Sequence, residues 1–470
     1  MFKHTLSLTI TVLTVLLPVL SHAEASKPNV IIVLTDDQGW GDVGFNGCMD
    51  IPTPNLDQLA KDGIVAQAGY ASHPYCSPSR AGLMIGRYQH RVGHENNTTY
   101  AHDNPDSGLP LDQVTMADVL GDNGYATAAI GKWHLGDFEK FWPNNRGFDH
   151  WFGFYGGGMS FWGQPKKGRP KSGVLRNGEI VPQSELSYLT DDFTDETIRF
   201  IDKNKDQPFF IYLAYNAPHA PIQATKEYLD MVSHIEFGDR AAYAAMVVGV
   251  DVGVGKIVDK LKQEGIYDNT LIFYYSDNGG HGFAARSDPF RGHKGMLFEG
   301  GIRVPFSITW PKGIPGGQRI EEPIIALDIF PTILSAAGIE KPAKLSLDGI
   351  NLLPHLNSGK TKWNIGRNLY WRYSDGAGIA IRQGKFKMVY SAFKQDFFLF
   401  DLEKDPYEQA NLAKVYPEKL EALKKAHAEW NSELMNSLWS DPHAENISKE
   451  EGKRQAFIDK AMAGQKNKKS

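Results

Sequence analysis

The sequence "NVIIVLTDDQG" at residues 29–39 decides the fold, because the five apolar residues 30–34 are followed, after Thr35, by two acids, Asp36 and Asp37. Three more segments follow the same pattern: "YATAAIGKWHLG" (125–136), "PFFIYLAYNAPHAP" (208–221) and "NTLIFYYSDNGG" (269–280). Continuous apolar runs of this length, bounded by turn-forming residues, indicate strands that are buried on both faces. We therefore expect four interior strands, each followed directly by polar side chains.

Helical patterns lie between these strands. They cover residues 53–63, 115–124, 190–204, 239–265 and 328–339, and several end at glycine. Strands that alternate with helices predict an α/β fold with a large mixed, mostly parallel sheet sandwiched by helices. Ligands bind such sheets outside the carboxyl ends of the strands, so the polar residues there should converge on one cleft.

The pattern changes near residue 360. Short strand patterns then alternate with turn signals at Asp375-Gly376, Gln383-Gly384 and Lys394-Gln395, and an amphipathic helix begins at Pro417. This order predicts a smaller C-terminal antiparallel sheet plus helix. The expected organisation is a signal peptide at 1–23, a catalytic α/β domain at 24–360, the C-terminal subdomain at 361–440 and a polar, lysine-rich tail at 441–470.

The N-terminus has the features of an export signal. Lys3 and His4 precede an apolar run from Leu6 to Leu20, and Ser21-His22-Ala23 follows as a small-residue cleavage pattern. The run is short for a membrane span, although a retained anchor is the alternative. We expect an exported protein, periplasmic or secreted, with no membrane association after cleavage. The net charge of −5 gives no support for nucleic-acid binding.

Acidic and amide oxygens follow two of the predicted strands: Asp36 and Asp37 follow the first, and Asp277 and Asn278 follow the last. Clustered carboxylates repel one another unless a cation lies between them, and oxygen ligands suit Ca²⁺ or Mg²⁺ better than zinc. Each pair alone could be a set of turn or cap residues. Two such pairs at equivalent ends of parallel strands favour a metal site.

Cationic and imidazole side chains occupy the neighbouring loops: Arg80, Lys132, His134, His219 and Lys294. Singly, such residues face solvent. Gathered beside an acidic metal site, they describe a pocket for a tetrahedral oxyanion such as sulfate or phosphate.

Cys76 is one of only two cysteines, and it begins the short helical segment "CSPSRAGLMIGRY". A helix N-terminus stabilises an anionic nucleophile or a bound anion. A thiolate nucleophile fits poorly beside an all-oxygen metal site, however, because thiolates prefer softer metals. Cys48 is expected to be a small packed residue or a loop thiol.

At these positions the chain resembles the formylglycine-dependent sulfatases of the alkaline phosphatase superfamily. "CSPSR" matches the signature Cys-x-Pro-x-Arg, and five further motifs stand in the family order: "VIIVLTDDQGWGD", "GKWHLG", "APHAP", "SDNGG" and "GHKGMLFEGGIRVP". The spacing is similar to the carbohydrate branch with N-acetylgalactosamine-6-sulfatases and bacterial carrageenan sulfatases. The resemblance covers about residues 28–430.

The resemblance implies that a formylglycine-generating enzyme converts Cys76 to Cα-formylglycine, whose hydrate is a geminal diol. It implies Ca²⁺ held by Asp36, Asp37, residue 76, Asp277 and Asn278. Arg80 would hold the diol, with Lys132 and His134 beside it. Lys132 and Lys294 would bind sulfate oxygens, and His219 would face the leaving oxygen as a general acid.

The favoured substrate is a sulfated carbohydrate, such as carrageenan or its oligosaccharides. The aromatic and basic segment 149–178, with Lys166, Lys167, Arg169, Lys171 and Arg176, could contact the sugar, or it could be a solvated loop. The His and Asn side chains of segment 90–102 are a second candidate for contacts with sugar hydroxyl groups. His281, Arg286 and Arg291 are expected to line the rim of the active site. The alternatives are an arylsulfatase, a glycosaminoglycan sulfatase, a phosphatase of the same superfamily, and a non-catalytic glycan-binding protein with Cys76 unconverted.

Overall fold

A computed structural model of the chain describes residues 27–98, 105–164, 172–282, 284–391 and 394–440. Within these ranges a ten-stranded sheet forms the centre of the molecule, in the order β11-β2-β10-β9-β1-β8-β4-β5-β6-β7. Its interior pairs β1–β8, β1–β9, β4–β8 and β4–β5 are parallel, whereas β10 and the strands at the far edge pair antiparallel. The predicted mixed, mostly parallel α/β sheet is confirmed.

The strands of the central sheet are β1 (Asn29–Thr35), β2 (Ile64–Ala66), β4 (Ala126–Lys132), β5 (His150–Phe154), β6 (Leu175–Arg176), β7 (Glu179–Ile180), β8 (Phe209–Ala214), β9 (Thr270–Ser276), β10 (Phe306–Thr309) and β11 (Gln318–Ile320). A separate short pair joins β3 (Gly69–Tyr70) and β12 (Ile324–Ile325). The α-helices are α1 (Pro54–Lys61), α2 (Cys76–Ile85), α3 (Met116–Asp122), α4 (Leu189–Asn204), α5 (Lys226–Met231), α6 (Asp239–Gln263), α7 (Glu299–Ile302), α8 (Ile329–Ala336), α9 (Leu353–Leu356) and α10 (Pro417–Asn431).

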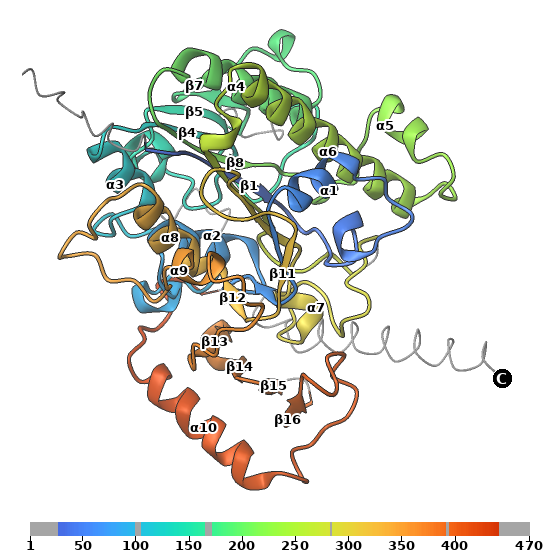
Figure 1. Cartoon of the computed structure of the whole chain (residues 1–470), viewed down its shortest axis with the longest axis vertical. Helices are drawn as coiled ribbons and strands as arrows, with labels where there is room; N and C mark the ends of the chain where they lie inside the picture. The colour runs from blue at the N-terminus through green and yellow to red at the C-terminus, as the bar shows by residue number, and fades with distance from the viewer. Residues whose placement is uncertain (1–26, 99–104, 165–171, 283, 392–393, 441–470) are drawn as a thin grey trace, which may run out of the picture.

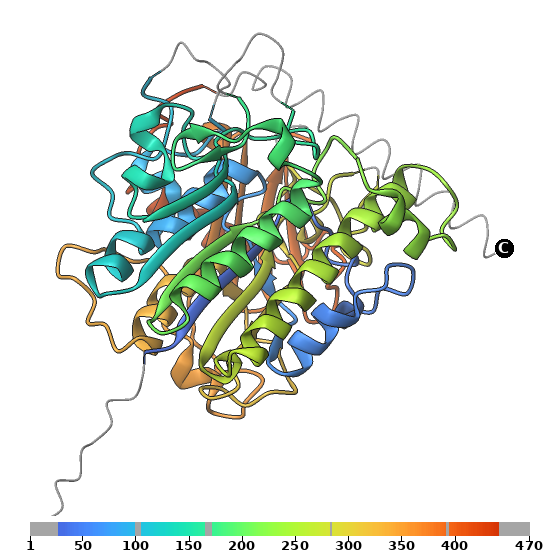
Figure 2. The same cartoon turned by 90° about the horizontal axis from the view of Figure 1, so that it is seen from above.

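Side chains alternate between the two faces of the sheet, because successive residues of a strand point in opposite directions. On β1, Val30, Ile32 and Leu34 pack in a core with α2, α3 and α8. Ile31 and Val33 pack on the opposite face in a core with α1, α4 and α6. Figure 2 looks onto α4 and α6, in green, which lie along that second face. This double burial explains why the strands are continuously apolar.

The four strands predicted first are neighbours in space, in the order β9-β1-β8-β4. Their register is continuous: Val33 of β1 pairs with Leu213 of β8 and with Tyr274 of β9. All four run in the same direction, so the polar residues that follow them lie along a single edge of the sheet. The fold therefore brings together side chains that are up to about 240 residues apart in the sequence.

A four-stranded antiparallel sheet follows, in the order β13 (Asn368–Tyr373), β14 (Gly378–Gln383), β15 (Phe386–Ser391) and β16 (Asp396–Asp401). The first two predicted turns separate its strands, as expected, and α10 packs against it through Leu420 and Leu423. Figure 1 shows this orange and red unit below the main sheet. Trp371 and Phe400 belong to a core shared with Tyr70 of β3 and Ile302 of α7, so the C-terminal sheet packs against β3 and α7.

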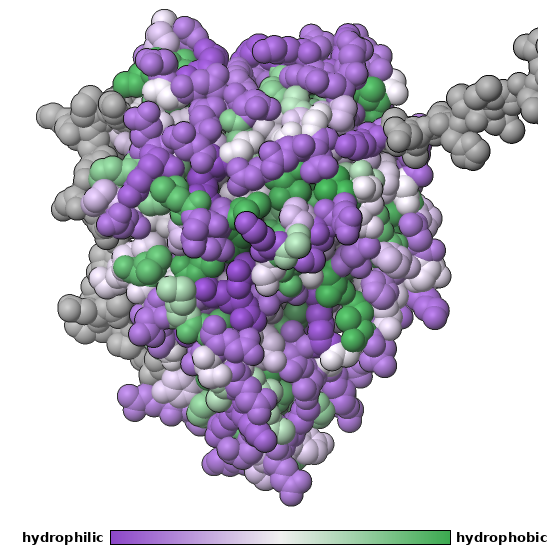
Figure 3. Space-filling view, turned by 90° about the vertical axis from the view of Figure 1, so that its left-hand side faces the viewer, coloured by the Kyte–Doolittle hydropathy of each residue, from purple (hydrophilic) through white to green (hydrophobic). Residues whose placement is uncertain are grey.

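Among the described residues, α6 is the one helix long and apolar enough to cross a membrane, but 78% of its apolar window is buried inside the protein. It is therefore the core helix of this fold. On the face shown in Figure 3, hydrophobic residues form small patches that are interrupted by hydrophilic ones. The predicted signal (1–23) and tail (441–470) lie outside the described residues.

Candidate active site

Three carboxylates and one amide meet beyond the ends of β1 and β9. The Asn278 amide nitrogen donates to Oδ1 of Asp37 at 2.8 Å, and the backbone N–H of Asp37 donates to Oδ1 of Asp277 at 3.3 Å. Asp36, Asp37, Asp277 and Asn278 are all at most 1% exposed. Asp37 has a φ of 66°, a strained value for a residue with a side chain, and such strain is concentrated at functional sites.

Cys76 is the first residue of α2 and is 2% exposed. Its Sγ lies 3.4 Å from Oδ1 of Asp36, 3.9 Å from Oδ1 of Asp37 and 3.2 Å from the Nζ of Lys294. Burial raises the pKa of the thiol well above its ordinary value, although the charges of Lys132 and Lys294 lower it. The unmodified Cys76 is thus a neutral thiol at physiological pH. This agrees with the expectation that it does not act as a thiolate nucleophile.

Arg80 lies one turn further along α2, so its side chain extends on the same side of the helix as Cys76. Its Nε and Nη2 pair with Oδ2 of Asp277 at 2.9 and 2.8 Å, and Nη1 donates to the carbonyl of Lys132 at 2.9 Å. Nη1 also lies 3.4 Å from the hydroxyl of Tyr212. This fully buried guanidinium joins the start of α2 to the ends of β4 and β9.

Two lysines neutralise the remaining carboxylates. Lys132, the last residue of β4, places its Nζ 2.6 Å from Oδ2 of Asp36. Lys294 places its Nζ 2.6 Å from Oδ1 of Asp37. Burial lowers the pKa of Lys294, but the charge of Asp37 and its neighbours outweighs burial and holds it well above the ordinary value. Both lysines therefore stay charged.

His219 reaches the same cluster from the loop after β8. Its Nδ1 donates to the carbonyl of Ala220 at 2.5 Å, which leaves Nε2 directed at Oδ2 of Asp37, 3.6 Å away. Burial lowers the pKa of His219 to about 3, so the resting ring is neutral. A Cβ added at Gly158 would lie 3.5 Å from this ring, so the predicted substrate segment 149–178 does reach the site.

His134 follows β4 and is 4% exposed, with a strained φ of 58°. Its backbone N–H donates to the carbonyl of Tyr155 at 2.9 Å, and its Nδ1 has no hydrogen-bond partner among the described residues. Burial lowers the pKa of His134 well below its ordinary value, and the charges of Lys132, Arg80, His219 and Lys294 add to that shift. His134 therefore shares the site as a neutral base.

The electrostatics of the carboxylates fit a cation site. Burial raises the pKa of Asp37, but Lys294, His219 and Lys132 outweigh it and hold the pKa below its ordinary value. Burial and the charge of Asp36 raise the pKa of Asp277, against the effects of Arg80 and Lys132. The lowered pKa keeps Asp37 ionised and available as a ligand.

A divalent metal fits the residues that are present. Apart from residue 76, the donors of the predicted set are hard oxygens, and two of them, Oδ2 of Asp37 and Oδ1 of Asn278, are buried without a hydrogen-bond partner among the described residues. Ligand atoms of Asp36, Asp37, Cys76 and His219 also lie within 4.8 Å of one another. Orphaned acceptors at a junction of this kind are explained by a bound cation.

One expectation about substrate contacts is wrong, and two of the arginines expected at the rim have partners within the protein. The described part of segment 90–102 is largely buried and bound within the protein: His90 to the carbonyl of Arg372, His94 to Ser77 Oγ, and Asn96 to the carbonyl of Trp439. The described part of this segment supports the first turn of α2, and its buried side chains are not available to bind a substrate. Arg286 pairs with Asp50, and Arg291 donates to the carbonyl of Glu408 near the C-terminal sheet.

The basic residues Lys166, Lys167, Arg169 and Lys171 lie outside the described residues, whereas Arg176 pairs with Glu185 and Glu196 at 3.2 and 3.3 Å. Cys48 is a packed thiol, as expected, and donates to Asp50 at 3.1 Å. Sequence patterns missed Tyr212, which holds Arg80 from the middle of β8. Its place on the α2 face of that strand follows from alternation, but an interior tyrosine carries no local signal of a polar partner.

Comparison with known proteins identifies the family of the chain. Residues 28–339 match the Sulfatase family model, and residues 291–438 match the model for "N-sulphoglucosamine sulphohydrolase, C-terminal". N-acetylgalactosamine-6-sulfatase of Sus scrofa is 33% identical over 451 residues, which cover 85% of this chain and 84% of that protein. Ps i-CgsB, crystallised in complex with k-i-k-neocarrahexaose, is 38% identical with a TM-score of 0.84 over 90% of this chain and 97% of that one. The PsFucS1 sulfatase from Pseudoalteromonas sp. is 26% identical with a TM-score of 0.75, over 87% and 91%.

The large mixed sheet, the separate antiparallel sheet and the charged centre at the strand ends define an α/β enzyme of the alkaline-phosphatase-like type. Within that class, the chain belongs to the sulfatase family. It is a sulfuric ester hydrolase.

Proposed function

We propose that this sulfatase removes sulfate from a sulfated carbohydrate, favouring a galactan such as carrageenan or its oligosaccharides, with a formylglycine made from Cys76 and a bound Ca²⁺. The observation that carries the proposal is the position of Cys76, at the N-terminus of α2 and within 3.9 Å of two carboxylates and a lysine. The sugar is supported by the relatives: N-acetylgalactosamine-6-sulfatases, and Ps i-CgsB with its bound oligosaccharide.

Calcium and formylglycine, when present, supply positive charge and the attacking hydroxyl group. Asp36, Asp37, Asp277 and Asn278 would hold the metal together with residue 76. The net charge of the site also suits the substrate. Without a metal, the three carboxylates are balanced by three cations, Arg80, Lys132 and Lys294. A divalent ion would leave a surplus of positive charge, which suits an anionic sulfate ester.

The side chains of the protein then divide the work. Lys132 and Lys294 lie where they can bind sulfate oxygens and stabilise the charge that develops on them. His219 keeps its Nδ1 proton on the Ala220 carbonyl, which fixes the orientation of Nε2 toward the centre of the site. A substrate anion beside Nε2 favours protonation of that nitrogen, from which the proton passes to the leaving sugar oxygen. His134, neutral and buried, can accept a proton from the hydroxyl at residue 76.

The experiment has two parts. The protein is produced with a formylglycine-generating enzyme, and mass spectrometry of the peptide that contains residue 76 shows whether the sulfur is lost. Sulfate release is then measured on carrageenan oligosaccharides, glycosaminoglycan disaccharides and aryl sulfates. Turnover of aryl sulfates alone would rule out the carbohydrate substrate. An unconverted Cys76 under these conditions would favour the non-catalytic, glycan-binding alternative.

We also propose that the mature protein is exported, to the periplasm or the medium. The proposal rests on the signal pattern at residues 1–23. N-terminal sequencing of the protein recovered from cell fractions tests it, and an intact N-terminus in the cytoplasm would contradict it.

A further inference from the structure

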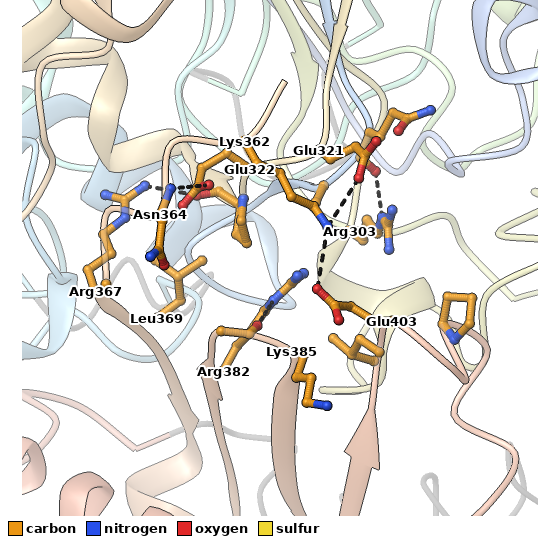
Figure 4. A pocket seen from close by; sticks show the side chains of 17 residues that line it. Arg303, Glu321, Glu322, Lys362, Asn364, Arg367, Leu369, Arg382, Lys385 and Glu403 are labelled. Atoms are coloured by element: carbon orange, nitrogen blue, oxygen red, sulfur yellow. Dashed lines mark hydrogen bonds and ion pairs between the residues drawn. The ribbon is translucent and has the colours of Figure 1, made fainter. Parts of the chain in front are cut away.

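A cavity of about 660 Å³ lies between the central sheet and the C-terminal sheet (Figure 4). Arg303, Glu321 and Glu322 line it from the central part of the chain, and Arg382 and Lys385 line it from the C-terminal sheet. None of the predicted catalytic or metal-binding residues belongs to its lining. It is therefore a separate site from the centre at Cys76.

Most charged groups of this cavity already have a protein partner. Lys362 bridges Glu321 and Glu403 at 3.2 and 3.3 Å, and Figure 4 shows its side chain between them. Glu322 accepts hydrogen bonds from three backbone N–H groups at residues 363–365. Arg367 pairs with both carboxylate oxygens of Asp328, and Lys385 pairs with Asp401 at 3.1 Å. These groups do not need a ligand.

Arg382 differs from them. Only 9% of it is exposed, and it forms no direct ion pair with a carboxylate of the described chain. Burial lowers its pKa, although the charge of Glu299 acts on it from further away and raises it. Nε donates to the carbonyl of Gly384 at 3.1 Å and Nη1 donates to the hydroxyl of Tyr70, so Nη2 is the nitrogen without a protein partner there. A buried guanidinium that touches no carboxylate directly is only partly compensated, and an anion from solution completes the compensation.

Arg303 presents a second open nitrogen. Its Nε donates to the carbonyl of Gln67 at 2.7 Å and its Nη1 pairs with Oε2 of Glu299 at 3.1 Å, which leaves Nη2 without a described partner. The same Glu299 oxygen accepts from Tyr70 at 2.6 Å, and Tyr70 accepts from Arg382. One buried Tyr70–Glu299 pair therefore holds both guanidinium groups, and both line the cavity.

We propose that this cavity is a second binding site for a sulfate group, held by Arg303 and Arg382. Guanidinium groups are well suited to tetrahedral oxyanions, because their N–H groups form paired bonds to two oxygens. The lining contains no aromatic ring among the described residues, which argues against a stacked neutral sugar as the ligand. The cavity volume allows either free sulfate or the sulfate group of a sulfated sugar to enter. The inference rests on the proposed function only for this choice of anion.

The first experiment locates the anion directly. Crystals of the full-length protein are soaked in sodium selenate, a heavier analogue of sulfate, and anomalous scattering is recorded. We expect a selenium peak between Arg303 and Arg382, in addition to any peak near Cys76. The variant Arg382→Gln should lose the cavity peak, and the matched control Lys385→Gln, which changes a paired lysine of the same lining, should keep it. An empty cavity, or a peak that persists in Arg382→Gln, overturns the proposal.

The second experiment separates the two sources of the anion. Calorimetry on Cys76→Ala protein, which cannot turn over, compares sodium sulfate with a sulfated galactan hexasaccharide. Arg382→Gln in that background should weaken binding about tenfold, the effect of losing one strong charged hydrogen bond. A loss for sulfate identifies the free ion, and a loss for the hexasaccharide alone identifies a sugar sulfate. Unchanged affinities for both contradict the site.

A third variant covers the case in which Arg382→Gln does not fold. Asn364→Asp adds a carboxylate to the lining, and the side chain of Asn364 makes no hydrogen bond in the described chain. It should weaken anion binding in the cavity with an unchanged melting temperature. The outcomes are independent of the proposed function: selenate in the cavity without sulfate release from any sugar refutes only that function, and hydrolysis with an empty cavity refutes only this site.

Discussion

The Nζ of Lys387 on β15 lies 2.8 Å from Oε1 of Glu299 at the start of α7, and both side chains are completely buried. The same Nζ lies 2.9 Å from Oε1 of Glu408, whose Oε2 accepts the backbone N–H of Glu299 at 2.6 Å. This group joins the C-terminal sheet to the segment that carries Lys294. Lys294 is in turn bonded through its backbone N–H to the carbonyl of Gly280, two residues after Asn278.

Replacing Lys387 by Met should therefore destabilise the whole protein. The substitution leaves the buried carboxylate of Glu408 without a cation and leaves Glu299 with Arg303 alone, and breaking a buried ion pair costs about 3–5 kcal/mol. Urea unfolding measures the change. The control is Lys385→Met, because Lys385 is half exposed and its pair with Asp401 should contribute less than about 1 kcal/mol. Equal losses of unfolding free energy in the two variants would show that the buried ion pairs of Lys387 contribute no more to stability than an exposed pair.

The same junction should make stability depend on pH. Burial raises the pKa of Glu408 to about 7, above the ordinary value of 4.5, with the charge of Glu299 adding to the shift and Lys387 opposing it. Between those values the folded protein holds a proton that the unfolded chain has lost, so the contribution of Glu408 is present below pH 4.5 and disappears as the pH rises through 7.

The difference in melting temperature between wild type and Glu408→Gln isolates this contribution from the buried histidines. We expect wild type to lose stability relative to the variant as the pH rises from 5 to 8. A difference that stays constant across this range would contradict the assignment of the proton to Glu408.

Calcium should raise the melting temperature of the wild-type protein, and a chelator should lower it. A ligand at 100 times its dissociation constant stabilises the folded state by about 2.7 kcal/mol. Asp37→Asn should abolish the calcium effect, because it removes a buried carboxylate oxygen that has no hydrogen-bond partner in the described chain. Asp50→Asn, a change to a partly buried carboxylate that pairs with Arg240 and Arg286, is the control and should respond as wild type does. An equal rise in melting temperature with magnesium would show that the site does not select calcium over magnesium.

Much of this architecture was predictable because the information is local. An apolar run such as residues 30–34 followed by Asp36 and Asp37 specifies both a doubly buried strand and the polar edge of the sheet. Thr115 and Asp118 form the reciprocal hydrogen bonds of a capping box, so the start of α3 follows from two side chains three residues apart. Because the four strands are parallel neighbours, the residues that follow them must lie at the same edge of the sheet.

Contacts between distant segments carried no such signal. Glu299 and Lys387 are 88 residues apart, and neither stands out from the charged residues around it. Segment 90–102 was misinterpreted for the same reason: His94 and Asn96 look like ligand-reading residues, but Trp439 covers this loop and donates from Nε1 to the carbonyl of Asn97. Local sequence does not distinguish a polar loop that faces solvent from one that another segment buries.

The role of His219 predicts a dependence on the leaving group. A sugar alkoxide needs a proton as it departs, whereas a nitrophenolate leaves well without one, so an enzyme that has lost its general acid is impaired mainly on sugar sulfates. His219→Ala should therefore reduce kcat/KM about 10²- to 10⁴-fold on a sulfated oligosaccharide and far less on 4-nitrophenyl sulfate. Lys294→Ala provides the contrast, because Lys294 would bind the sulfate group that both substrates share, and it should impair both to a similar extent. If His219→Ala also slowed both substrates equally, His219 would be positioning the substrate or the Asp37 carboxylate 3.6 Å away, and another group would have to supply the proton.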